Sequence, residues 1–504
     1  MKAHLLYPDA DFDFAAVLPP GHADLIQDLE LGRLLTAMAG SDKFLRDVCT
    51  RVLLTSLTEP AVIRYRQQIL ADCIDHPEVI RQMFGIAVGA LQDKRSIWGF
   101  FSSRNPSSIL SGAVNQLDVL VARLRQLRRL ADEHAGAFRS PGLTALVASL
   151  QRDLDDEYFD TIARHLRQLK FRDGVPISAQ LDRDNSGIHF VLRSGSTRRG
   201  WRERVGIEPR SVYSFTLAPR DEAGAQALSD LTARGINLVA NAAARSADHV
   251  TSYFTMLQAE LGFYVCCLSL HDELTARDVP VTFPVPAAEL GSAPELSCAD
   301  LRDAALALQT DRVVGNDVDA DGKPLVIITG ASSGGKSTFL RSVGLAQLML
   351  QAGMFATARS LRSSVCRQVF THFTREEDAT MVSGRLDEEL ARMSAISDHL
   401  GPGCLVLFNE SFAATNEREG SEIGRQVVGA LLQAGIRVCF VTHQFDFADS
   451  FRRDQPDSTL FLRAPRQPDG QRTFRLEAAE PLPTSFGQDI YHRIGGWLGG
   501  QDTG

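Results

Sequence analysis

The segment Gly330–Thr338 has the residue types and spacing of a phosphate-binding loop. Its sequence, which fits the pattern GxxxxGK[ST], is Gly330-Ala331-Ser332-Ser333-Gly334-Gly335-Lys336-Ser337-Thr338. Glycines allow the backbone to turn so that successive amide groups point at phosphate oxygens. The Lys336 ammonium suits the β- and γ-phosphates, and the Ser337 hydroxyl can ligate Mg²⁺. The segment therefore predicts a binding site for ATP and Mg²⁺.

Two further polar strand ends supply groups that phosphate chemistry requires. Asn409 and Glu410 follow the apolar run Leu405–Phe408, and His443 follows the run Ile436–Val441. In nucleotide-hydrolysing proteins of this kind, such positions hold the metal and activate water. Glu410 is therefore the candidate general base and His443 the candidate sensor of the γ-phosphate. An Asp is usual at the Asn409 position, so we expect weaker Mg²⁺ binding and slow turnover, because an amide oxygen carries no charge.

These groups need a parallel sheet to bring them together. From residue 324 onward, short apolar runs alternate with helical patterns, which is typical of a parallel sheet with helices on both faces. We predict strands at Leu325–Thr329 and at the two runs named above, with helices at 337–352, 384–400 and 418–434. Polar residues at the carboxyl ends of parallel strands face the ligand crevice. The predicted fold is an α/β P-loop domain.

The preceding residues predict a different, largely helical organisation. Residues 20–170 show apolar residues at helical spacing, for example from Leu117 to Leu127. Alternating and β-branched residues in 174–218 predict a small antiparallel sheet, with strands at 175–181, 188–193 and 211–217. A long helix is expected over 221–274, and the Pro-, Ala- and Gly-rich stretch 280–296 is typical of a linker. The predicted domains are 1–173 and 219–300 as two parts of a helical domain, 174–218 as its β insertion, and 301–504 as the ATPase domain.

Composition limits the class of protein. The 504 residues include 44% hydrophobic residues and carry a formal net charge of −9, so nucleic acid could be bound only at a local basic patch. Eight scattered cysteines without a CxxC pair predict reduced core thiols rather than zinc ligands or disulfides. We see no signal peptide and no apolar run near the ~18 residues of a spanning helix, which predicts a cytoplasmic protein without a membrane segment.

The most basic stretch of the chain is the loop around Trp201. Its arginines are Arg198, Arg199, Arg202 and Arg204. Guanidinium groups around an aromatic ring suit phosphate contact combined with base stacking, so this loop is the candidate DNA-binding element. Solvated surface charge without a ligand is the alternative interpretation of the same residues.

Residues 313–445 resemble the ATPase domain of the MutS family of DNA mismatch-repair proteins. The matching segments are Asn316-Asp317, TGASSGGKSTFLR at 329–341, LVLFNES at 405–411, ATNEREG at 414–420 and VTHQF at 441–445. The resemblance implies an ABC-type ATPase, preceded by an α-rich lever domain with a short β clamp, that works as a dimer on DNA. It also implies that Asn316 contacts the nucleotide and that Ser383, Gly384 and Arg385 form the signature that reaches the partner's nucleotide.

The sequence also departs from the family pattern. The only Phe-x-Glu is Phe408-Asn409-Glu410, so the mismatch-probing element is not found, and we expect a short form without the N-terminal mismatch-recognition domains. Val313 stands near the position of an aromatic that stacks on adenine. Two other functions stay open: an ATP-binding switch with little hydrolysis, and an ABC-type ATPase that acts on a protein partner.

Overall fold

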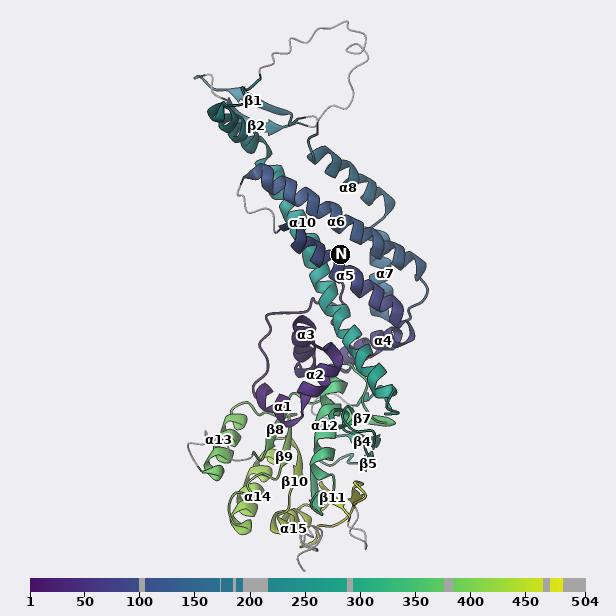
Figure 1. Cartoon of the computed structure of the whole chain (residues 1–504). Coiled ribbons are helices and arrows are strands. Elements are labelled where there is room, and N and C mark those ends of the chain that lie inside the picture. The colour runs from purple at the N-terminus through teal and green to yellow at the C-terminus, as the bar shows by residue number, and fades with distance from the viewer. Residues whose placement is uncertain are drawn as a thin grey trace, which may run out of the picture. The chain divides into compact units, whose positions relative to one another are not determined.

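The computed structural model describes residues 1–98, 105–172, 174–184, 187–193, 216–287, 293–375, 384–465 and 472–483 (Figure 1). Contacts within the chain define two compact units. The first consists of Met1–Ala3, Glu78–Phe138 and Leu143–Leu261, and the second of His4–Pro77, Arg139–Gly142 and Gly262–Gly504. Residues 4–77, which we expected in the helical domain, thus group with the α/β fold, and the predicted domain limits remain predictions.

The second unit contains a six-stranded sheet with the order β12-β11-β6-β10-β9-β8. All pairings are parallel except that of β11 with β12. The strands are β6 (Leu325–Gly330), β8 (Val369–Phe373), β9 (Leu405–Asn409), β10 (Arg437–Val441), β11 (Thr459–Ala464) and β12 (Glu477–Ala478). The three predicted strands are confirmed as β6, β9 and β10 at the centre of this sheet, whereas β8, β11 and β12 were not predicted.

Helices cover both faces of this sheet, which explains why its central strands are apolar without alternation. The four helices are α12 (Lys336–Gln351), α13 (Arg385–Ser397), α14 (Glu417–Gln433) and α15 (Phe445–Asp454). Phe408 and Phe440 stack at 5.0 Å, and Phe440 meets Phe447 of α15 at 4.5 Å, in a core that α13 and α14 also line. The predicted helices at 337–352, 384–400 and 418–434 are confirmed with shifts of a few residues at their ends.

A second, four-stranded sheet lies in the same unit and corrects one prediction. Its order is β3-β7-β4-β5, with β3 (Val285–Ala287), β4 (Leu296–Leu301), β5 (Asn316–Asp319) and β7 (Ser360–Ser364). The expected linker at 280–296 therefore contains strand β3 and the first residue of β4. Its proline content was misleading because β3 is an edge strand, where a residue such as Pro286 is tolerated. The short helix α11 (Ala304–Ala307) follows β4.

The second unit also contains the N-terminal helices (Figure 1) and the last part of α10 (Glu222–Thr275). The N-terminal helices are α1 (His22–Asp28), α2 (Leu31–Ala39), α3 (Lys43–Leu54) and α4 (Pro60–Asp75). α1 packs against the edge strand β8, and α2 and α3 pack against α11 and α12. Arg341 of α12 forms ion pairs with Glu30, between α1 and α2, and with the buried Asp303. These contacts fix the helix that follows the phosphate-binding loop.

The first unit is built from long helices and one hairpin. Its elements are α5 (Pro77–Trp98), α6 (Pro106–Glu133), α7 (Pro141–Asp153), α8 (Asp156–Leu169), β1 (Ile177–Leu181), β2 (Gly187–Leu192) and the first part of α10 (Glu222–Thr275). The predicted apolar face of α6 is buried, as at Leu120 and Leu124. The hairpin β1–β2 is antiparallel, as predicted. Most of the third expected strand, at 211–217, lies outside the described residues.

α10 has the length and composition of a membrane-crossing helix, and among the described residues it is the one helix of this kind. However, 72% of its most apolar stretch is buried inside the protein, as in a core helix.

The eight cysteines are all buried and free, in agreement with the prediction of core thiols.

The close contact of α14 with the residues after β9 generates a stability prediction. A Cβ atom at Gly420 would lie 2.2 Å from the Phe412 carbonyl oxygen and 2.4 Å from Gln444 Nε2, whereas a Cβ at Gly429 of the same helix meets nothing within 4 Å. We expect Gly420→Ala to destabilise the protein by about 1–3 kcal/mol, as overpacking does. Gly429→Ala should be neutral or stabilising by up to ~1 kcal/mol, because alanine favours helix. Thermal denaturation of the full chain measures both, and equal melting temperatures would contradict the packing argument.

Candidate nucleotide-binding site

The predicted phosphate-binding loop connects β6 to α12 and contains three residues in left-handed backbone conformations. Gly330, Ser333 and Gly335 have φ of 104°, 57° and 90°. A Cβ atom at Gly330 would lie 2.5 Å from the Ala464 carbonyl oxygen, and one at Gly334 would lie 2.6 Å from the Ala464 Cβ. Glycine is thus required both for the backbone turn and for the close approach of β11. The loop ends where α12 begins, so the positive end of the helix dipole faces any anion held there.

Lys336, the first residue of α12, is folded back into this loop. Its side chain is buried, and Nζ donates hydrogen bonds to the carbonyl oxygens of Gly330 at 3.2 Å and Ala331 at 3.0 Å. Its pKa is lowered to about 8, mainly by burial; the Glu410 charge opposes this shift, and the Arg472 charge contributes to it. The loop therefore holds a partly desolvated ammonium group that a nearby anion would stabilise.

The ends of β9 and β10 bring the other predicted groups to the same edge of the sheet. Glu410 Oε1 lies 2.9 Å from His443 Nε2, and the hydrogen bond from His443 holds the pKa of Glu410 below its usual value. The Ser337 hydroxyl donates to Asn409 Oδ1 at 2.8 Å. The two predicted metal ligands, Ser337 and Asn409, thus lie next to each other. The two predicted catalytic groups, Glu410 and His443, also lie next to each other.

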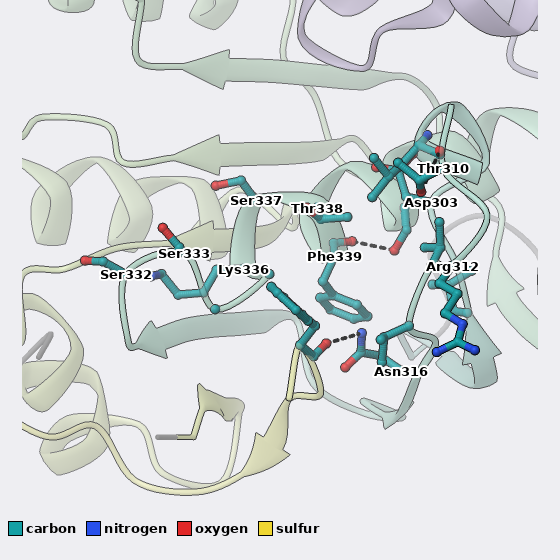
Figure 2. Close-up of a pocket in the computed structure, with 18 of the residues that line it drawn as sticks. Asp303, Thr310, Arg312, Asn316, Ser332, Ser333, Lys336, Ser337, Thr338 and Phe339 are labelled. Atoms are coloured by element: carbon teal, nitrogen blue, oxygen red, sulfur yellow. Dashed lines mark hydrogen bonds between the residues drawn. The ribbon is translucent and has the colours of Figure 1, made fainter. Parts of the chain in front are cut away.

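A pocket of about 590 Å³ lies beside the loop (Figure 2). Ser332, Ser333, Lys336 and Ser337 lie at one side of it, and Thr310, Arg312 and Asn316 at the other. The other residues that line the pocket include Val313, Val314, Thr338, Glu410, His443 and Phe474. The pocket therefore carries a cation and hydroxyl groups at the loop, and a mixture of polar, cationic and apolar side chains elsewhere, which suits a phosphate chain attached to a base.

Asn316 lines this pocket but is committed to the protein backbone. Its Nδ2 donates to the Phe474 carbonyl oxygen at 3.3 Å, and its Oδ1 accepts from the Leu476 amide at 2.7 Å. Asn316 thereby fixes Phe474, whose side chain is 48% exposed at the pocket wall. The sequence contained no signal for Phe474, because it lies far along the chain from the loop.

A buried histidine that the sequence analysis missed holds the segment after Glu410. His372 of β8 lies 2.7 Å from the Ser411 hydroxyl through Nδ1 and 2.9 Å from the Glu389 carbonyl through Nε2. Burial lowers its pKa to about 4, so the ring is neutral at physiological pH. Glu389 of α13 also accepts the Phe412 amide at 2.8 Å. The sequence signal that could have identified His372 is its position as a polar residue near the carboxyl end of the apolar strand β8.

Other predicted residues stand apart from these contacts. Gly384 caps α13 and Arg385 begins it, with Asp387 and Glu388 in the first turn. Ser383 lies outside the described residues, as do the arginines at 198, 199, 202 and 204. The signature and DNA-binding assignments therefore remain predictions.

The residues at the loop fit Mg²⁺ and a nucleoside triphosphate. Three residues of the loop, Gly330, Ser333 and Gly335, have left-handed backbone conformations, and the loop residues 332–338 line the pocket. Ser337 and Asn409 offer the oxygen ligands that Mg²⁺ prefers, and the Glu410 carboxylate lies next in sequence. Lys336 supplies the cation. The arrangement is suited to bind phosphates and to accept a proton from water.

Comparison with known proteins agrees with this geometry. Residues 58–277 match the model of the MutS2 N-terminal domain, and residues 326–487 match that of MutS domain V. The DNA mismatch repair protein MutS of Acaryochloris marina is 28% identical over 293 residues, covering 53% of this chain and 29% of that protein. MutS of Chloroflexus aurantiacus is 30% identical over 169 residues, which cover 32% of this chain and 17% of that protein. The probable DNA mismatch repair protein Msh6 of Drosophila melanogaster is 34% identical over 132 residues, which cover 26% of this chain and 11% of that protein. The matched segments thus span less than a third of each relative.

The lowered pKa of Lys336 predicts that affinity for phosphate ligands depends on pH. Below about pH 8 the side chain is already charged, and above it binding must take up a proton. We therefore expect the affinity for ATP to fall as the pH rises from 8 to 9.5, approaching tenfold per unit. Calorimetric titration at several pH values measures this.

Lys336→Arg is the matched control, because a guanidinium does not titrate in this range. Its affinity, even if lower overall, should stay flat between pH 8 and 9.5. A flat profile for the unmodified protein would show that Lys336 does not supply the charge that the ligand needs.

Proposed function

Because the chain belongs to the MutS family, we propose that it binds and hydrolyses ATP with Mg²⁺ and couples this cycle to DNA binding. The observation that carries the proposal is the convergence of three strand ends on one pocket: the Lys336 loop after β6, Glu410 after β9 and His443 after β10. Each group has a different role in phosphate chemistry, and all three line the same cavity.

The proposed roles follow from the contacts of each side chain. Lys336 and the loop amides hold the phosphates, and Ser337 and Asn409 hold Mg²⁺, which neutralises phosphate charge when bound. Glu410 accepts the proton of the attacking water, and its low pKa keeps it ionised for this purpose. His443 orients the Glu410 carboxylate at 2.9 Å and is placed to sense the γ-phosphate. Phe474 provides the aromatic wall for the base that Val313 cannot provide.

We further propose that the protein acts as a homodimer in which Ser383, Gly384 and Arg385 of one copy contact the nucleotide of the other. This is supported by the position of Gly384 and Arg385 at the start of α13, where helix amides favour phosphate. The helical unit and the hairpin β1–β2 serve in this proposal as the lever and the clamp that grip DNA. The MutS relatives are named as mismatch-repair proteins, and a role in DNA repair or recombination in the cytoplasm is the corresponding proposal here.

The ATP-binding switch is the second candidate function, and Asn409 is the observation that favours it. Ser337 already donates to the neutral Asn409 amide, so the metal site has no charge from this position. We expect Asn409→Asp to lower the Mg²⁺ concentration needed for half-maximal ATPase activity by about tenfold, because a carboxylate is a stronger ligand. A Mg²⁺ titration of steady-state ATPase for both proteins tests this, and an unchanged half-maximal concentration would contradict it.

Glu410→Gln separates the ATPase from the switch. If Glu410 is the base, kcat should fall by about 10²-fold or more while ATP still binds, since general base catalysis contributes this much. Equal and negligible turnover in both proteins, with ATP binding retained, would establish the switch.

DNA binding through phosphates predicts a steep dependence on salt. The logarithm of the affinity for duplex or branched DNA should fall against log salt with a slope of about −0.9 per neutralised phosphate. Reversing the charge of Arg198, Arg199 and Arg202 should weaken binding and make the slope shallower. Reversing three exposed arginines of the second unit, Arg418, Arg425 and Arg453, is the control and should leave binding unchanged. Filter binding measures both. A salt-insensitive interaction would favour the third function, an ATPase that acts on a protein partner.

A further inference from the structure

A short segment after β11, residues 472–476, lies beside the phosphate-binding loop, and we name it the strap. A Cβ atom at Gly335 would lie 3.5 Å from the Cα, Cβ and carbonyl oxygen atoms of Phe474. Gly335 and Phe474 both line the pocket beside the loop. The strap therefore brings an aromatic residue to the pocket at a point close to the proposed phosphate site.

The backbone of the strap is strained at Phe474. Its φ is 56°, in the left-handed region that residues with a side chain rarely adopt. Phe474 is also 48% exposed, so burial of its ring in a core does not compensate for this strain. Strained conformations of this kind persist only where surrounding contacts fix them. Contacts close to Phe474 must therefore hold its backbone in place.

Asn316 of strand β5 supplies these contacts. Its Nδ2 donates to the Phe474 carbonyl oxygen at 3.3 Å, which Figure 2 shows as a dashed line, and its Oδ1 accepts from the Leu476 amide at 2.7 Å. Asn316 is only 6% exposed, and β5 is paired with β4 in the four-stranded sheet. The nitrogen and the oxygen of this buried amide thus both hold the strap, from a strand that the sheet fixes.

An aromatic ring that is held in advance can stack on a nucleobase at a lower cost. Ordering a free side chain or loop on binding costs conformational entropy, which a preorganised segment has already lost. Stacking on an aromatic ring suits any base, because every base has a π-face. Val313 and Val314 also line the pocket but offer no ring. A loss of the Asn316 amide would therefore weaken contact with the base and leave the phosphate-binding groups in place.

We propose that Asn316 is a positioning residue of the nucleotide site, which holds Phe474 in the strained conformation that presents its ring to the base. This role differs from the direct contact with the nucleotide that the family resemblance implied for Asn316. The inference rests on the proposed nucleotide binding. It assigns the affinity for the base to Asn316 and Phe474 acting together, and it leaves the phosphates to the Lys336 loop.

The test compares ATP with inorganic tripolyphosphate, which has no base, in the presence of Mg²⁺. Calorimetry at pH 7 should show ATP binding about tenfold weaker in Phe474→Ala, because stacking of one base contributes about this much. Asn316→Ala and the isosteric Asn316→Asp should weaken ATP binding by up to about the same factor. The affinity for tripolyphosphate should stay unchanged in all three. Arg475→Ala, at an exposed residue of the same strap, is the matched control and should bind both ligands like the unmodified chain.

The double variant Asn316→Ala/Phe474→Ala decides whether Asn316 acts through the ring. If it does, the double variant should bind ATP no more weakly than Phe474→Ala alone. Additive losses would overturn the inference, because Asn316 would then contribute to binding independently of Phe474. An equal loss of affinity for tripolyphosphate in Asn316→Ala would also overturn it, because the residue would then support the loop. Unchanged ATP affinity in Phe474→Ala would have the same effect.

Two further measurements separate these outcomes from trivial ones. Circular dichroism melting verifies the fold of each variant, and Asn316→Asp, which keeps the size of the side chain and an acceptor for the Leu476 amide, replaces Asn316→Ala if that variant does not fold. Phe474→Trp keeps an aromatic ring and should retain ATP affinity. Failure of the unmodified chain to bind either ligand would instead reject the proposed function, and with it this inference.

Discussion

The parallel register of β6, β10 and β9 is the constraint on which the site depends. Ile328, Val441 and Asn409 are aligned across the three strands, so the residues that follow them leave the sheet at one edge. The ladder continues past the strands, because the Thr442 amide donates to Ile328 and the Glu410 amide to Val441. A one-residue slip of β9 would turn Glu410 to the opposite face and separate it from His443. The apolar burial of these strands therefore also sets the geometry of the candidate catalytic groups.

The segment after β9 is held from two sides. On one side, His372 and Glu389 contact Ser411 and Phe412, and the Thr374 hydroxyl donates to the Glu410 carbonyl at 2.6 Å. On the other side, Gln444 Nε2 donates to the Phe412 carbonyl at 3.0 Å. Glu410 and Phe412 have φ of 55° and 62°, a conformation that costs energy for residues with side chains. These neighbouring contacts stabilise that backbone and fix the direction of the Glu410 carboxylate. Because Glu389 belongs to α13, the helix that Gly384 caps is hydrogen-bonded to the segment that carries Glu410, the proposed base.

The site also concentrates charge that is only partly solvated. Lys336 donates hydrogen bonds to two loop carbonyls, and burial lowers its pKa to about 8. Glu410 obtains its stabilisation from His443. Such preorganised groups reorganise little when a charged ligand arrives, which is the physical advantage of assembling them in a rigid sheet edge. The glycines of the loop also contribute to this preorganisation, because they let β11 approach the loop backbone closely.

The sequence by itself determined the local features of this protein. These features depend on residues that are close in the sequence: the spacing of Gly330, Gly335 and Lys336, the apolar runs before Asn409 and His443, and the long helix to Thr275. The structure confirms the corresponding strands, loop and helices. Edge strands are harder to predict, because residues such as Pro286 pair on one side only and need no continuous apolar pattern.

Only the tertiary structure decided which distant residues meet. Phe474 and Arg472 reach the loop from more than a hundred positions along the chain, His372 supports Ser411 from the neighbouring strand, and Glu30 pairs with Arg341 from the N-terminal helices. Strand order and helix packing create these contacts, and a single sequence carries no local signal for them. The residues proposed to bind phosphate could thus be found in the sequence, whereas the residues that contact them from distant parts of the chain could not.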